Sequence, residues 1–77
     1  MWEVIGFESQ RDDEGNVTAY TMYATKSFKG EKGAGKKARR VWYRTEEIDY
    51  KPVVGDVVVI ETETRGKYEV VTDIWVA

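Results

Sequence analysis

The chain has 77 residues, of which 12 are Lys or Arg and 14 are Asp or Glu, giving a net charge of −2, and it contains neither Cys nor His. This length predicts one domain over residues 1–77 with a small core. The missing residue types exclude disulfides and the zinc sites built from Cys and His, and they remove the usual general base near neutral pH. We therefore expect a protein that is not an enzyme and has no metal or other cofactor.

The first half of the chain predicts two strands joined by a turn. Residues 2–8 are apolar and β-prone, and Gly6 within them is typical of a bulge or bend. Residues 12–16 (DDEGN) have the composition of a turn. Residues 17–25 (VTAYTMYAT) are rich in Thr, Tyr and Val, which favours a second strand.

The second half predicts three more strands and a long basic loop. A segment rich in Gly and Lys, at about residues 27–38, is expected to form a flexible loop, since so long a connection is unusual in a small hairpin. Five strands without a helical period predict an all-β fold, a small five-stranded OB-like barrel. The remaining strands are expected at residues 39–45, 57–62 and 68–76, with an acidic connection or single helical turn at 46–50 and turns at 52–56 and 64–67.

Alternation along the third strand predicts which of its side chains face the core. Val41 and Tyr43 share one face of the strand, and Arg40, Trp42 and Arg44 share the other. Burying two arginines would be costly. We therefore expect Val41 and Tyr43 to lie inside, and Trp42 to be exposed between two cations.

The second and last strands give a less complete prediction. In the second strand two alternatives remain open: Tyr20 and Met22 face the core and Tyr23 is exposed, or the reverse. In the last strand we expect the more apolar face to be buried. That face carries Tyr68, Val70, Thr72, Ile74 and Val76.

Charge is strongly segregated along the chain. Residues 26–44 hold eight of the twelve basic residues and one acid, Glu31, whereas the remaining residues hold four basic residues and thirteen acids. The segment therefore carries a charge of +7 and the remainder a charge of −9. Such segregation indicates a surface that binds a polyanion.

Cations and aromatic side chains alternate within this basic segment. Lys and Arg can neutralise phosphates, and an exposed aromatic ring can stack on an unpaired base. We therefore expect a non-catalytic protein that binds single-stranded nucleic acid, with single-stranded DNA as the first candidate. The predicted binding residues are Lys26, Phe28, Lys29, Lys32, Lys36, Lys37, Arg39, Arg40, Trp42 and Arg44.

Other interpretations of the same residues remain. Trp42 could cover a core edge or a dimer contact, and the acidic remainder could be the working surface of a phage or mobile-element module that acts on a host protein. Binding of double-stranded DNA or of RNA is a third alternative. Residues 30–36 fit G-x-x-x-x-G-K, but Lys37 stands where a P-loop has Ser or Thr, and no helix is predicted to follow. Nucleotide hydrolysis is therefore not expected.

The layout resembles the gene V-type single-stranded DNA-binding proteins of filamentous phages, and OB-like barrels more broadly. The resemblance rests on residues 15–24 (GNVTAYTMYA), the basic hairpin, Pro52-x-x-Gly55 before an apolar strand, and a tight hairpin at Gly66. The Pro-x-x-Gly-Asp turn also opens strands in SH3-like barrels. Membership would imply a dimeric barrel whose second and third strands form a DNA-binding hairpin. The residues placed for that role are Lys26, Phe28, Lys36, Lys37, Arg39, Arg40 and Trp42.

The sequence also bears on location and assembly. No apolar run approaches the roughly 20 residues that span a bilayer, and the first residues lack the pattern of a signal peptide. We expect a cytoplasmic protein with no membrane partner. Because a core of this size is marginal, we also expect a homodimer.

Overall fold

The structure is a computed structural model that describes residues 1–27 and 35–77. These residues form no helix that could cross a membrane. Their regular elements are five β-strands: β1 (Trp2–Arg11), β2 (Val17–Ser27), β3 (Lys36–Arg44), β4 (Val57–Arg65) and β5 (Tyr68–Val76).

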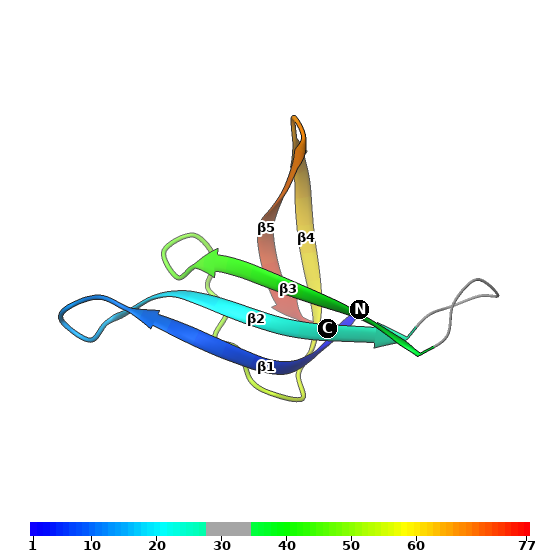
Figure 1. The fold of residues 1–77 in the computed structure, drawn as a ribbon, viewed down its shortest axis with the longest axis horizontal. Coiled ribbons are helices and arrows are strands. Elements are labelled where there is room, and N and C mark those ends of the chain that lie inside the picture. Colours follow the sequence, from blue (N-terminus) through cyan, green and yellow to red (C-terminus); the bar gives the residue numbers. More distant parts are fainter. Residues whose placement is uncertain (28–34) are drawn as a thin grey trace.

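The five strands form one antiparallel sheet in the order β3-β2-β1-β4-β5. Strands β1, β2 and β3 run side by side, and the β4–β5 hairpin stands steeply across them (Figure 1). The two parts join where Trp2 and Glu3 of β1 pair with Val58 and Val57 of β4. The sheet curls so that its outermost strands, β3 and β5, approach one another without pairing. The predicted all-β, small OB-like barrel is therefore confirmed, with its seam open between β3 and β5.

Local chemistry explains where the first strands turn and bend. A register shift between Val4 and Gly6 places a bulge in β1, as predicted for this glycine. After β1, the carboxylate of Asp12 accepts hydrogen bonds of 2.9 Å from the backbone amides of Glu14 and Asn16. This side chain satisfies amides that the turn leaves unpaired, so it stabilises the reversal into β2.

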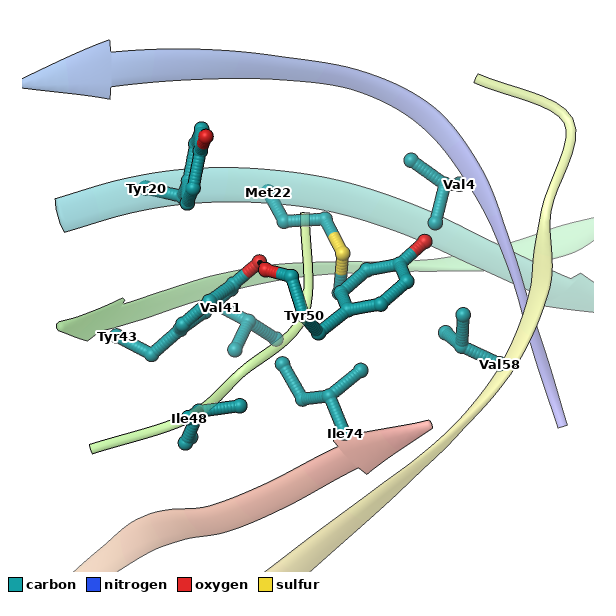
Figure 2. Packing of buried hydrophobic residues seen from close by; sticks show 9 residues of the cluster. All are labelled: Val4, Tyr20, Met22, Val41, Tyr43, Ile48, Tyr50, Val58 and Ile74. Atoms are coloured by element: carbon teal, nitrogen blue, oxygen red, sulfur yellow. Dashed lines mark hydrogen bonds between the residues drawn. The ribbon is translucent and has the colours of Figure 1, made fainter. Parts of the chain in front are cut away.

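The core lies between the curled halves of the sheet (Figure 2). Val41 and Tyr43 are buried, as predicted for the third strand, and the second strand buries Tyr20 and Met22 while Tyr23 is only partly buried. The complete cluster of buried side chains is Val4, Tyr20, Met22, Val41, Tyr43, Ile48, Tyr50, Val58 and Ile74.

The prediction for the last strand is wrong in part. Ile74 is buried, but Tyr68 is 77% exposed and Val71 packs against the core instead. The reason is a register shift: Glu61 pairs with Asp73, whereas the next residue of β4 pairs with Val71, so one residue of β5 is left over. A bulge of this kind reverses the alternation of side chains along the strand.

The connection between β3 and β4 completes the core. The backbone amide of Ile48 donates to the carbonyl of Arg44 at 3.1 Å, so this connection begins with a single helical turn, one of the predicted alternatives. The Tyr43 hydroxyl donates to the backbone carbonyl of Tyr50 at 2.7 Å, and the Tyr50 hydroxyl donates to Asp56 at 2.8 Å. Burial raises the pKa of both phenols, and the hydrogen bond to Asp56 adds to the shift that raises the pKa of Tyr50 to about 12.

Candidate nucleic-acid interface

Alternation along β3 divides the predicted binding residues between two faces of the sheet. We call the side of β1, β2 and β3 that faces away from the core the outer face, and the opposite side the inner face. Val41 and Tyr43 are buried on the inner face, so Lys37 and Arg39 share that face by register. The outer face of β3 carries Lys36, Arg40, Trp42 and Arg44.

Trp42 is the centre of the outer face of β3. Its side chain is 49% exposed, as the sequence predicts. The guanidinium carbon of Arg44 lies 5.7 Å from the centre of its ring, within the range of a cation–π contact. The indole Nε1–H donates a hydrogen bond of 3.3 Å to Oε1 of Gln10, across β2. These contacts hold an exposed aromatic surface beside a cation.

The cations of this face are largely free of carboxylates. Arg44 approaches Glu46 at 3.8 Å, but both side chains are more than half exposed, so the pair is weak. Within residues 1–27 and 35–77, Lys36 and Arg40 have no carboxylate at ion-pair distance. Among the described carboxylates none neutralises these two charges, so they can attract an anionic partner.

Charge changes in steps across the outer face. The cations lie on the edge strand β3, while the facing positions of β2 carry the neutral side chains of Thr21, Tyr23 and Thr25. The next positions, on β1, include Glu3 and Glu8. A polyanion would consequently be attracted to β3 and β2 and repelled from β1.

The inner-face cations make contacts within the protein itself. The ammonium of Lys26 lies 4.7 Å from the ring centre of Trp2, and the guanidinium of Arg39 lies 5.6 Å from the same ring. Arg39 also forms an ion pair of 3.0 Å with Glu69 of β5. The β5 bulge brings Glu69 to the core side of its strand, because it reverses the alternation there. This ion pair links the two sides of the open seam.

Both strands of the basic hairpin extend further than predicted. Ser27 pairs with Lys36, and Lys26 pairs with Lys37, so residues 36–38 belong to β3 rather than to the expected loop. Lys26 and Lys37 are thus directly opposite one another, an arrangement that costs stability through like-charge repulsion. Three predicted binding residues, Phe28, Lys29 and Lys32, lie outside the described residues.

A hollow of about 420 Å³ lies next to Trp42 on the outer face. The residues that line it are Gln10, Val17, Thr18, Ala19, Trp42, Arg44, Thr45 and Glu46. Among the described residues no group of three or more metal-ligating side chains comes together.

Sequence reasoning did not single out Gln10, Trp2 or Glu69. Trp2 stands in an apolar run that indicates a core strand, and Glu69 stands among many surface acids. Gln10 gains its place only through the register between β1 and β2. An alternating pattern within one strand cannot reveal such a partner, because the contact depends on how separate strands align.

Comparisons of this chain with models of protein families, with curated proteins and with solved structures give no match.

Proposed function

We propose that this protein binds single-stranded nucleic acid, with single-stranded DNA as its first candidate, and that it does so without catalysis. The observation that carries the proposal is the half-exposed ring of Trp42, flanked on the same face by Arg40 and Arg44. Aromatic rings between cations are the usual means of holding unpaired nucleotides with little sequence preference.

The nucleic-acid strand would follow β3. Lys36, Arg40 and Arg44 recur every fourth residue on the outer face, which spaces their backbone positions by about 13 Å. Each cation would neutralise phosphates and release counterions, while Trp42 would stack on a base. If about four to six phosphates are neutralised, log K should fall with log salt at a slope near −3 to −4.

The resemblance to gene V-type proteins and the homodimer belong to the same proposal. The OB-like strand order and the basic β2–β3 hairpin support the resemblance. Exposed apolar residues at Val54, Val57 and Trp75 support self-association, because a small domain gains buried area in this way. Sedimentation equilibrium would test the dimer; a monomer mass at every concentration would contradict it.

A specific observation favours a second function. Glu61 and Asp73 are direct cross-strand partners on β4 and β5, and Trp75 lies two residues beyond Asp73 with 43% of its surface exposed. Two acids directly opposite one another cost stability, so their presence beside an exposed aromatic ring fits a surface for a basic protein partner. The protein would then act as an interaction module through its acidic side.

One titration separates these functions. Fluorescence anisotropy would be measured with single-stranded DNA, duplex DNA and RNA of the same length and sequence, over a series of salt concentrations. We expect single-stranded DNA to bind and its affinity to follow the slope given above. No binding of any oligonucleotide at low salt would overturn the proposal in favour of the interaction module. If RNA or the duplex binds more tightly than single-stranded DNA, that nucleic acid is the partner instead.

A further inference from the structure

The hollow beside Trp42 has the size of a binding pocket. Its volume of about 420 Å³ exceeds the lower limit of roughly 300 Å³ for sites that hold small molecules. It is open to solvent on the outer face, where one wall is the indole of Trp42. An unpaired base could therefore enter it from a strand that lies along β3.

The register of three strands explains why the hollow exists. Gln10, Ala19 and Arg44 occupy one row across β1, β2 and β3. Trp42 belongs to the adjacent row, opposite Thr21, and its ring reaches diagonally to Gln10. The middle position of the first row holds only the methyl group of Ala19, which is 2% exposed, so the floor of the hollow lies low between two long side chains. A larger residue at Ala19 would fill this space.

The hydrogen bond from Trp42 fixes the orientation of the Gln10 amide. An indole N–H can only donate, so the atom that receives it at 3.3 Å must be the amide oxygen. The amide NH₂ group of Gln10 is then left with its two donors. Arg44, on the opposite side of the hollow, also carries donors and no acceptor. Donors therefore predominate on the two long side chains that flank the floor, while the carboxylate of Glu46, which also lines the hollow, supplies acceptors.

Arg44 leaves almost enough room for a base to stack on the indole. A flat ring held between the indole and the guanidinium needs a separation of about 7 Å, which is twice the usual contact distance. The present distance is 5.7 Å. A movement of little more than 1 Å, by a side chain that is 55% exposed, would admit the base.

We propose that this hollow is a pocket for one nucleobase, and that it prefers a base with an exocyclic carbonyl oxygen over adenine. Guanine, cytosine, thymine and uracil all carry such an oxygen, whereas the exocyclic group of adenine is an amino group that donates. The NH₂ of Gln10 would donate to that oxygen while the base stacks between Trp42 and the guanidinium of Arg44. This inference rests on the proposed function, and it adds a base preference that stacking alone does not supply.

The test uses strands of eight nucleotides in which seven positions are abasic and one carries a base. Adenine and hypoxanthine are compared, since both are purines and differ at the exocyclic position, where hypoxanthine has a carbonyl oxygen. At low salt we expect the hypoxanthine strand to bind about fivefold more tightly than the adenine strand, as one hydrogen bond supplies. A fully abasic strand measures the phosphate contribution alone.

Three variants identify the residues responsible. Gln10→Met keeps the length of the side chain and should abolish the difference between the two purines. Ala19→Leu should reduce both purine strands to the affinity of the abasic strand, because it fills the floor of the hollow. Thr21→Val, in the adjacent row, is the matched control and should retain the preference. Circular dichroism would confirm that each variant is folded.

The possible outcomes are distinct. Equal affinity for adenine and hypoxanthine in the wild type would overturn the pocket while leaving the proposed function intact. A preference that survives Gln10→Met would overturn the role of this amide. If the wild type binds none of the strands, the abasic strand included, and also fails to bind ordinary single-stranded DNA, the proposed function itself fails and the pocket with it.

Discussion

The hydroxyl of Tyr43 donates a 2.7 Å hydrogen bond to the backbone carbonyl of Tyr50, and this bond anchors the β3–β4 connection to the sheet. Tyr50 continues the chain of hydrogen bonds through its own hydroxyl to Asp56, directly before β4. Both aromatic rings belong to the core. The same two side chains therefore supply apolar packing and hold the polar backbone of an irregular segment in place.

Substitution of Tyr43 by Phe should lower the free energy of unfolding by about 1–3 kcal/mol, because it leaves the buried carbonyl of Tyr50 without its partner. Urea unfolding followed by fluorescence measures the change. Tyr68→Phe is the control, since Tyr68 is 77% exposed, and it should leave the midpoint unaltered. Equal effects of the two substitutions would show that the Tyr43 hydrogen bond contributes nothing to stability.

Stability should fall in alkaline solution. Tyr50 has an ordinary pKa of 10.0, which burial first and the hydrogen bond to Asp56 second raise to about 12 in the folded protein. The folded state thus holds the proton more tightly than the unfolded state. The resulting stabilisation is complete below pH 10 and is lost as the pH rises from 10 to 12.

Unfolding curves at pH 9 and at pH 11 check this dependence. Tyr50→Phe should be less stable than the wild type at pH 9 but should lose less stability between the two pH values. Tyr68→Phe removes a phenol that is exposed in the folded protein, and this variant should lose the same amount of stability as the wild type between the two pH values. If Tyr50→Phe loses as much stability between pH 9 and pH 11 as the wild type does, the Tyr50 phenol is not the cause of the alkaline loss.

Core truncation should be costly in proportion to burial. Met22 is completely buried among the cluster shown in Figure 2, so Met22→Ala should destabilise the fold by about 2–5 kcal/mol. Val53 is 54% exposed in the connection before β4, and Val53→Ala should have little effect. Thermal unfolding of both variants shows whether the loss of stability follows the burial of the substituted side chain.

The two faces of the basic hairpin should differ in their effect on nucleic-acid binding. Lys36→Ala with Arg40→Ala removes two outer cations, and it should make the salt slope shallower by about 1.4, at roughly 0.7 for each phosphate. Lys26→Ala with Arg39→Ala removes the same charge from the inner face and should change the slope much less. Anisotropy titrations across a salt series compare the pairs. Identical slopes in the two double variants would mean that the faces are not distinct.

The ion pair between Arg39 and Glu69 should make a small contribution to the closure of the barrel. The side chains are 27% and 57% exposed, so a coupling free energy of about 0.2–1 kcal/mol is expected, as for other solvent-accessible pairs. A double-mutant cycle with Arg39→Ala and Glu69→Ala measures it by urea unfolding. A coupling free energy of zero would mean that apolar contacts alone hold β3 and β5 together at the seam.

Parts of this fold could be predicted from the local chemistry of the sequence. The β5 bounds were predictable because turn residues and Gly66, which adopts a φ of 60°, mark the hairpin before it. The faces of β3 were predictable because one choice would have buried Arg40 and Arg44. The exposure of Trp42 follows from that choice alone.

The remaining features depend on alignment between strands. The β5 bulge reverses which side chains meet the core, and no residue type in β5 indicates its position. The division of the cations into two faces required the true start of β3 at Lys36, which the Gly- and Lys-rich composition obscured. Gln10 reaches Trp42 only because Ala19 lies between them. Such relationships are properties of the assembled sheet.

The stepwise change of charge from β3 to β1 has a consequence for partner selection. Two strand spacings separate the cations of β3 from the acids of β1, a distance of about 10 Å. The two backbones of a DNA duplex lie on either side of grooves about 6 and 12 Å wide, so a duplex placed on the β3 edge would bring its second backbone toward Glu3 and Glu8. Repulsion there would reject a paired ligand, while a lone strand would avoid the acids altogether.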